Sequence, residues 1–471
     1  MTAVTNALAE FAANLTFAEM PDAVVTQAES LFLDLTGVMI RGQSLDSTLA
    51  LKAALRDLGL TAGKARLAGS DELWTPFGAA LVNGAAAHSL DFDDTHARSE
   101  IHPGAPIIPA ALAAAEIVDA DTRTLLAGVV AGYEIMCRVA EGLAPTARPE
   151  RGFHITGVAG AFGAAAAAGN ILGLTPQQMA SAFGTALSQS AGSRQFMING
   201  AWTKRFHVGN ASAAGLMAAM LARHDYSGAV DALEGRYGFF ALYSNAPQPE
   251  AAIRGLGSIW EILAVGIKPY SCCRAIHAAL DAVQELRSCE EIKLSAILSV
   301  RVGLAQKSYD LTGAPQAMKR APVTAVDCQF STHFCVASML ALGRVSFDEF
   351  ESLVADPEIK SLMQRTDVYV EPRVEAEYPQ RFSGLVEIGM EDGRTLTKFV
   401  PTPSGEPETM LSEAQLREKF GALVSPTLGA AGEAALFAAI GRMTEGYPAV
   451  RLLDLMQPPS NPEKLRAQGG V

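Results

Sequence analysis

Residues 157–174, GVAGAFGAAAAAGNILGL, are almost all small or apolar. Their length raises the question of a membrane span, which takes about 20 predominantly apolar residues. Alanine and glycine make the stretch only weakly apolar, and Asn170 lies inside it. Small side chains also let neighbouring helices approach one another closely. We therefore predict that these residues form a buried helix in a soluble helical bundle.

Helical patterns extend outward from this stretch, from the start of the chain to about residue 265. Thr175 and Pro176 suit the cap and the first position of a helix. Apolar residues recur at helical spacing in four further segments, which are residues 24–38, 110–118, 125–139 and 211–222. These patterns predict successive helices over the first half of the chain.

The pattern changes after about residue 266. Alternation of apolar and polar residues predicts strands, and the Asp392-Gly393 pair predicts a hairpin turn. The expected strands are residues 296–304, 367–375, 384–389 and 395–400. A helix is expected at 331–342, and helical patterns return at 412–420 and 431–443.

The order of these patterns indicates a mainly α protein with two domains. Residues 1–266 and 405–471 are expected to form a large all-helical domain. Residues 267–404 are expected to form a smaller α+β domain, inserted before the C-terminal helices. A chain of 471 residues is long enough for this division and for a sizeable core. The tail from Pro458 onward is rich in proline, glycine and charge, and we expect it to be loose.

The charge balance argues against nucleic acid as a partner, because the formal net charge is −13 and no basic stripe is present. The six cysteines show neither a disulfide nor a zinc spacing, so we expect reduced thiols. The sequence does not open with a basic segment followed by an apolar core, so no signal peptide is evident. We expect a cytoplasmic protein without a membrane partner.

Residues 83–104, NGAAAHSLDFDDTHARSEIHPG, contain three histidines and three aspartates. Burial of so many titratable groups is costly unless they pair with one another or take part in chemistry. If the segment is helical, His88, Asp91 and Thr95 lie on one face of the helix.

The Pro103-Gly104 pair would end such a helix and place His102 on a turn above that face. One interpretation of the segment is a helix cap with surface salt bridges. A second is an acid/base site, in which Asp91 tunes a histidine and His102 moves a proton near neutral pH. A third is a metal site, for which the sequence offers the ligands His88, Asp91, Asp93, Asp94, His96 and His102. Because no HExxH or paired CxxC motif is present, we expect no metal.

Basic residues also stand at three expected helix starts. His154 precedes the alanine-rich stretch, Lys204 lies in TKRFHVGNASAAG, and Lys268 lies in IKPYSCCRAIHAALDA together with Arg274 and His277. Helix N-termini attract anions, and ligand sites favour domain junctions. Cations converging from these segments would suit a substrate with two or three carboxylates. Nucleotide binding and serine hydrolysis have little support, because no Walker A, GxGxxG or GxSxG motif is present.

Five motifs together resemble the MmgE/PrpD family, which includes 2-methylcitrate dehydratases, cis-aconitate decarboxylases and iminodisuccinate epimerases. The motifs are VNGAAAHSLDFDDTH with HPG, RGFHITGVAGAFGAAAAAGNILGL, TKRFHVGNASAAG, IKPYSCCRAIHAALDA and QFSTHFCVASMLALG. They follow the family's order, and the resemblance covers roughly residues 5–455.

The resemblance implies a homodimer, in which each subunit has a helical domain, an α+β lid and an active site between them. It also implies that no metal or organic cofactor is required. The family's active-site positions correspond to Asp91, Thr95, His102, His154, Lys204 and Lys268, with His277 close by. The family often has a tyrosine where this chain has Phe334, so one hydroxyl near the site is missing.

We therefore expect a lyase that dehydrates or decarboxylates a small di- or tricarboxylic acid such as 2-methylcitrate or cis-aconitate. The expected catalytic residues are His102, Asp91, Lys204 and Lys268. The expected substrate-binding residues are Thr95, His154, His277 and Arg274. The lysines would stabilise a carbanion-like intermediate, and His102 would carry a proton to or from carbon. Two alternatives remain open: an isomerase or epimerase of a dicarboxylate such as iminodisuccinate, and a non-catalytic carboxylate-binding protein.

Overall fold

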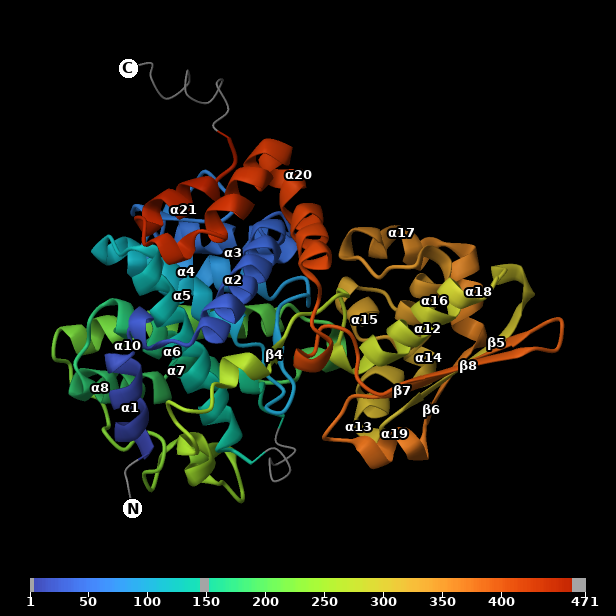
Figure 1. The fold of residues 1–471 in the computed structure, drawn as a ribbon, viewed down its shortest axis with the longest axis horizontal. Coiled ribbons are helices and arrows are strands. Elements are labelled where there is room, and N and C mark those ends of the chain that lie inside the picture. The colour runs from blue at the N-terminus through green and yellow to red at the C-terminus, as the bar shows by residue number, and fades with distance from the viewer. Residues whose placement is uncertain (1–3, 145–151, 460–471) are drawn as a thin grey trace.

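The protein, described here by a computed structural model of residues 4–144 and 152–459, consists mostly of helices (Figure 1). Its strands are few and short. The prediction of a mainly α protein is therefore confirmed. Arg151 of the RGFHIT motif lies outside the described residues, and so does the loose tail predicted from Pro458, except for its first two residues.

The alanine-rich stretch forms helix α7 (Ile155–Ile171) inside the large helical lobe. Every residue of α7 except Ile155 and Asn170 is buried. The Asn170 amide donates hydrogen bonds to the carbonyl oxygens of Ala12 and Leu15, at 2.8 and 2.9 Å. The helices packed around α7 include α5 (Gly104–Val118), α6 (Thr122–Glu141) and α10 (Thr203–Arg223). The prediction of a buried helix is confirmed.

The other helices of this lobe come from both ends of the chain, because α20 packs against α2. Thr175 caps α8 as predicted, and its hydroxyl accepts a hydrogen bond from the Gln178 amide at 3.2 Å. Helix α20 kinks at Gly429, whose φ is 71°. The helices are α1 (Val4–Asn14), α2 (Asp22–Gly42), α3 (Asp46–Asp57), α4 (Pro76–Ala87), α8 (Pro176–Leu187), α9 (Phe196–Asn199), α11 (Phe239–Tyr243), α20 (Glu413–Ile440) and α21 (Ala449–Leu455).

Two helices, α2 and α20, are long and apolar enough to cross a membrane by length and composition alone. Within the apolar window of each helix, 72% of the residues of α2 and 39% of those of α20 are buried inside the protein. Core helices of soluble proteins have the same length and composition, so these two helices are weak evidence for a membrane span.

The smaller lobe contains a four-stranded sheet with the order β6-β5-β7-β8. Strand β6 runs parallel to β5, and the other neighbours are antiparallel. Val302 at the centre of β5 pairs with Val368 on one side and with Val386 on the other. The strands are β5 (Ile297–Leu304), β6 (Thr366–Val370), β7 (Gly384–Met390) and β8 (Thr395–Val400).

The helices of the smaller lobe include α12 and α16, which both pack against the sheet. The strand predicted over residues 367–375 was too long, because Pro372 has no amide hydrogen for a sheet bond and instead begins α19. These helices are α12 (His277–Cys289), α13 (Gln306–Ser308), α14 (Gln316–Lys319), α15 (Ala325–Gln329), α16 (Thr332–Leu342), α17 (Phe350–Ala355), α18 (Pro357–Arg365) and α19 (Pro372–Glu377).

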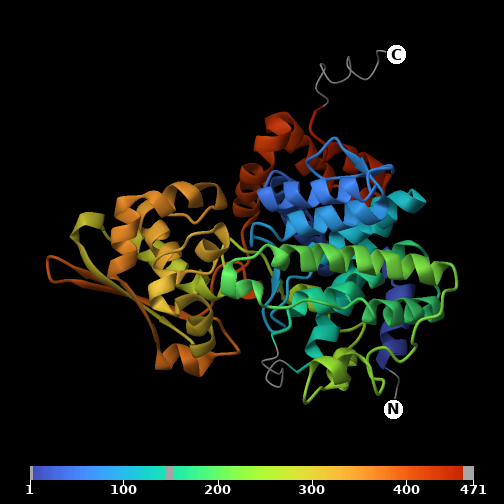
Figure 2. The same ribbon diagram turned by 180° about the vertical axis from the view of Figure 1, so that it is seen from behind.

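Two clusters of buried apolar residues underlie the two lobes that Figures 1 and 2 show. The larger cluster runs from Val4 to Ile267 and continues from Leu416 to Met456. The smaller cluster runs from Tyr270 to Val400. The predicted domain boundaries, at residues 266/267 and 404/405, lie close to the points where the chain passes from one cluster to the other. The division into domains stays a prediction.

Close packing of α7 against α10 gives a first test of the fold. A Cβ atom added to Gly215 would lie 2.4 Å from the Ala164 Cβ and 2.5 Å from the Ala165 nitrogen. We therefore expect Gly215→Ala to lower the free energy of unfolding by about 1–3 kcal/mol, measured by urea denaturation. Gly421→Ala in α20 is the control, because its Cβ would meet no atom within 4 Å. That variant should gain up to about 1 kcal/mol, and equal destabilisation of both variants would contradict the packing argument.

Candidate active site

The segment that follows α4 is not a helix. Helix α4 ends at Ala87, and Thr95 and His96 form the short strand β3, which pairs with β4 (Val265–Gly266). Asp91 has a φ of 51°, a left-handed conformation that aspartate tolerates better than most residues. The prediction that His88, Asp91 and Thr95 share one helical face is therefore wrong.

The prediction that the Pro103-Gly104 pair ends a helix is also wrong, because the pair begins one. Pro103 is the N-cap residue of α5. Proline suits a helix start, since a helix does not need the amide hydrogen there. His102 therefore lies immediately before a buried helix, and its amide donates a hydrogen bond to the Thr156 hydroxyl of α7 at 3.2 Å.

Asp91 lies between two lysine ammonium groups that come from distant parts of the chain. The Lys204 Nζ, in the first turn of α10, is 2.5 Å from Asp91 Oδ1. The Lys268 Nζ, just after β4, is 3.3 Å from the same oxygen and donates to the Asp91 carbonyl oxygen at 2.9 Å. All three side chains are buried.

The two lysines decide the charge of this carboxylate. Burial by itself raises the pKa of Asp91, but attraction to Lys204 and Lys268 outweighs burial and holds the pKa well below its usual range. Burial by itself would lower the pKa of Lys268. Attraction to Asp91 and Asp93 outweighs burial, so the pKa of Lys268 is raised. Asp91 and Lys268 are therefore both charged at neutral pH.

Side chains of the smaller lobe hold the backbone of the Asp91 loop. Ser271 Oγ and Gln329 Nε2 donate to the Leu90 carbonyl oxygen, at 2.6 and 2.8 Å. From the C-terminal helix α20, Lys419 Nζ donates to the Phe92 carbonyl oxygen at 3.0 Å. Sequence reasoning missed Gln329 and Lys419, since no local pattern marks them. The site is therefore assembled from both lobes.

Three side chains of residues 83–104, those of His88, Asp93 and His102, form a second group beside Asp91. His88 Nδ1 is 2.6 Å from Asp93 Oδ2, and His102 Nδ1 is 3.7 Å from the same oxygen. His102 Nδ1 is also 3.0 Å from the Asp94 carbonyl oxygen, which can only accept. His102 therefore carries its hydrogen on Nδ1 when neutral, and its Nε2 is the atom that can take up a proton.

Burial keeps the histidines of the site neutral. Burial lowers the pKa of His102 to about 3, attraction to Asp93 offsets this only in part, and repulsion from Lys268 adds to it. The pKa of His88 and that of His154 lie well below the usual range, also mainly because of burial. In the absence of a bound anion, His102 is therefore neutral near pH 7.

His154 and Thr95 complete the group predicted from the sequence. His154 is the N-cap residue of α7, and its ring stacks on that of His88 with centroids 5.7 Å apart. His96 pairs with Ile101 in an isolated antiparallel bridge, so Thr95 and His102 directly flank the two paired residues. The Thr95 hydroxyl is buried and has no hydrogen-bond partner among the described residues, which leaves it available to a ligand.

Arg274 and His277 instead pair with each other and with a neighbouring loop. Arg274 is 2.6 Å from Glu406 Oε1 and 3.0 Å from His277 Nδ1. His277 Nε2 lies 3.2 Å from the Cys272 carbonyl oxygen, so both ring nitrogens are occupied. Within the described residues, no hydrogen bond joins this pair to Asp91, and a role in substrate binding stays a prediction.

Phe334 lies in the core of the smaller lobe. It is fully buried, and its ring packs edge-on against Phe350 with centroids 5.3 Å apart. An aromatic side chain without a hydroxyl suits this apolar environment.

Among the described residues, one group of side chains offers three metal ligands. Ligand atoms of His88, Asp93 and His102 lie within 4.8 Å of one another. Lys204 and Lys268 repel positive charge at His88, and they would oppose a cation there in the same way. The expectation that no metal is required stays a prediction, and the arrangement suits an anion better.

Asp94 provides a pH-dependent test of the site. Its carboxylate accepts hydrogen bonds from Tyr133 and from the Gly104 amide, at 2.7 and 3.0 Å. Burial raises the pKa of Asp94 to about 8, and the bond from Tyr133 offsets this only in part. The folded protein keeps this proton above the ordinary aspartate pKa of about 3.9, so stability is expected to fall as the pH rises from about 4 to about 8.

We expect Asp94→Asn to reduce that decline, because asparagine has no proton to lose. The measurement is the free energy of urea unfolding at about pH 5 and about pH 8.5 for the wild type and the variant. Asp57→Asn, at the exposed end of α3, is the control and should decline as the wild type does. An equally steep decline in Asp94→Asn would show that other groups cause it.

Comparison with known proteins matches both halves of the chain. Residues 6–252 match the MmgE/PrpD N-terminal domain, and residues 270–441 match the MmgE/PrpD C-terminal domain. The chain is 27% identical over 436 residues to a cis-aconitate decarboxylase of Aspergillus terreus, with 88% of each chain covered. It is 26% identical over 480 residues to the cis-aconitate decarboxylase of Homo sapiens, with 98% of this chain and 96% of the human protein covered. The chain therefore belongs to the MmgE/PrpD family.

Proposed function

We propose that this protein decarboxylates a small unsaturated tricarboxylate of the cis-aconitate class, without a metal or an organic cofactor. Membership of the MmgE/PrpD family and the cis-aconitate decarboxylase relatives support an enzyme of the lyase kind. The observation that carries the proposal is the pair of buried ammonium groups on Asp91, next to a neutral His102.

The lysines supply the binding energy for a polyanion. Lys204 and Lys268 place two ammonium groups beside the single Asp91 carboxylate, and Asp93 offsets part of this positive charge. Lys204 Nζ has three hydrogens and uses one on Asp91, so two remain for substrate carboxylates. The Thr95 hydroxyl can donate a further bond. Charge-assisted bonds of this kind are strong in a buried site.

The chemical step follows from this arrangement. The bond between a carboxylate carbon and its neighbour breaks, CO2 leaves, and the electron pair is delocalised into a remaining carboxylate that the lysines stabilise. The bound polyanion raises the pKa of His102, so its Nε2 binds a proton and then donates it to the substrate carbon. The bond from Nδ1 to the Asp94 carbonyl oxygen fixes the ring during this transfer.

Dehydration has less support than decarboxylation. Loss of water requires a second acid aimed at the departing hydroxyl. Asp94 is the buried carboxyl with a pKa of about 8, but Tyr133 and the Gly104 amide already occupy both of its oxygens. The cluster therefore suits decarboxylation, which needs His102 as its one proton carrier, better than dehydration.

The proposal is tested by assaying the purified protein with cis-aconitate, 2-methylcitrate and iminodisuccinate. We expect CO2 release from cis-aconitate and no reaction with the other two compounds. Water loss from 2-methylcitrate would indicate a dehydratase, and stereochemical inversion of iminodisuccinate would indicate an epimerase. Thermal stabilisation by all three compounds without turnover would indicate a carboxylate-binding protein.

We also propose that the protein is a cytoplasmic homodimer. Sedimentation velocity would measure the mass of the assembly.

A further inference from the structure

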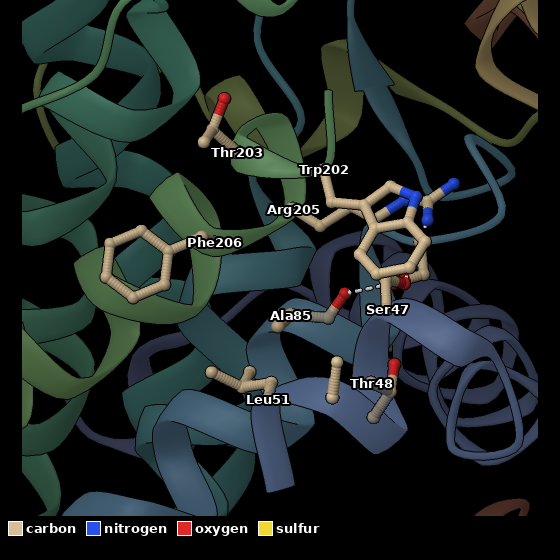
Figure 3. Close-up of a pocket in the computed structure, with 10 residues that line it drawn as sticks. Ser47, Thr48, Leu51, Ala85, Trp202, Thr203, Arg205 and Phe206 are labelled. Atoms are coloured by element: carbon tan, nitrogen blue, oxygen red, sulfur yellow. Dashed lines mark hydrogen bonds between the residues drawn. The ribbon is translucent and has the colours of Figure 1, made fainter. Parts of the chain in front are cut away.

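A pocket of about 240 Å³ lies between the first turns of α3 and α10 (Figure 3). It is lined by Ser47 and Thr48 of α3, and by Trp202, Thr203, Arg205 and Phe206 at the start of α10. Neither Asp91 nor its two lysines line it. Lys204 and Arg205 are neighbours in α10, and side chains one residue apart point about 100° apart around a helix. Lys204 therefore faces Asp91, while Arg205 faces this pocket.

Arg205 is a buried cation without an anionic partner in the part of the chain that the structure describes. Its relative exposure is 6%, and its side chain donates a hydrogen bond to Ser47 Oγ at 2.8 Å. Among the described residues it forms no ion pair, although a guanidinium group has five N–H donors. Burial lowers the pKa of Arg205 to about 10, and attraction to Asp91 offsets this only in part. Buried charges are normally paired, so Arg205 indicates a missing anion.

The pocket lies beside the starts of two helices. Helices α3 and α10 have 12 and 21 residues, and the first turn of each contributes residues to the pocket wall, although α3 also carries the exposed Asp46 in that turn. The first amides of a helix have no carbonyl partner in the helix, and the helix dipole favours negative charge there. Two helix starts and a buried guanidinium therefore border the same small volume.

The remaining walls of the pocket are apolar. Trp202 and Phe206 are 48% and 45% exposed, and Leu51 and Ala85 line the opposite wall. A volume of about 240 Å³ lies below the range of about 300–1,000 Å³ that is typical of drug-sized ligands. The pocket therefore suits a small molecule with an anionic end at Arg205 and an apolar end.

We propose that this pocket binds a small monocarboxylate with a short apolar chain, at a site separate from the Asp91 cluster. The carboxylate accepts hydrogen bonds from Arg205 and from the Ser47 hydroxyl. The alkyl chain contacts Trp202 and Phe206.

Sodium butyrate is the probe, and Trp202 emission is the readout. The chain contains three tryptophans, so Trp202→Phe identifies the part of the signal that comes from the pocket. We expect saturable quenching by butyrate and none by 1-butanol, which lacks the charge. Arg205→Gln should weaken butyrate binding at least tenfold, whereas Arg205→Lys should bind within tenfold of the wild type. Arg223→Gln removes an exposed charge from the last turn of the same helix and should leave binding unchanged.

Further experiments distinguish butyrate binding in this pocket from binding at the Asp91 cluster and from an interface between two copies of the chain. Lys268→Met should keep the butyrate response, and its loss there would assign the signal to the Asp91 cluster. If Arg205→Gln instead changes the sedimentation coefficient while butyrate has no effect on the wild type, the pocket is an interface between two copies of the chain. If Arg205→Gln does not fold, a wild-type crystal soaked in butyrate still decides. The carboxylate must then lie about 3 Å from Arg205, and its absence overturns the proposal.

Discussion

Replacing His102 with glutamine is expected to lower kcat for cis-aconitate decarboxylation by about 10²–10⁴-fold, with a smaller change in KM. Glutamine retains a hydrogen-bonding side chain but cannot carry a proton at the position of Nε2. His102 contributes no permanent positive charge, because burial lowers its pKa to about 3, so substrate binding depends less on it than the proton transfer does. Steady-state CO2 release measures both constants.

His224→Gln is the matched control for this prediction. His224 lies at the exposed end of α10, away from the motif, and its replacement should leave kcat unchanged. The urea midpoint of both variants shows whether the fold is retained. A His102→Gln protein that keeps more than half of the wild-type turnover would falsify the proton-transfer role.

Lys268→Met is expected to lower kcat/KM by about 10²–10³-fold, the usual cost of removing one electrostatic donor from a transition state. Its ammonium group is fully buried and contacts both the carboxylate and the carbonyl oxygen of Asp91. Methionine has nearly the same length and no charge, so it removes the charge with little change in packing. Steady-state kinetics with cis-aconitate is the measurement.

The same variant should also be less stable, because Asp91 would keep only Lys204 as a buried partner. Breaking a buried ion pair by removing one member costs about 3–5 kcal/mol when no other partner remains, and Lys204 reduces that cost here. Lys64→Met is the control, since Lys64 is exposed. Loss of stability with wild-type activity would make Lys268 a structural residue and contradict the proposed mechanism.

Local sequence patterns predicted the helices of this protein well. The apolar repeat at residues 24–38 lies inside α2, and the alanine-rich stretch became the buried helix α7. Thr175 caps α8, and the Asp392-Gly393 pair connects β7 to β8. Spacing and caps act over a few residues, so the sequence specifies them without reference to the rest of the fold.

The loop that contains Asp91 could not be predicted in this way. Its residues fit a helical face, but contacts from outside the segment hold it in another conformation. Hydrogen bonds from Ser271, Gln329 and Lys419 to the carbonyl oxygens of Leu90 and Phe92 fix a turn with a left-handed Asp91. Tertiary hydrogen bonds thus overrode the local pattern.

The sequence by itself determined which residues could carry charge, and it determined the helices that hold them. Only the tertiary structure decided which charges meet. Lys204 and Lys268 converge on Asp91 across 113 and 177 residues of chain. Arg274 instead donates a hydrogen bond to Glu406. The physical reason is range. Helix formation depends on neighbours three and four residues away, while the burial and attraction that set the charges of this site depend on side chains brought together by folding.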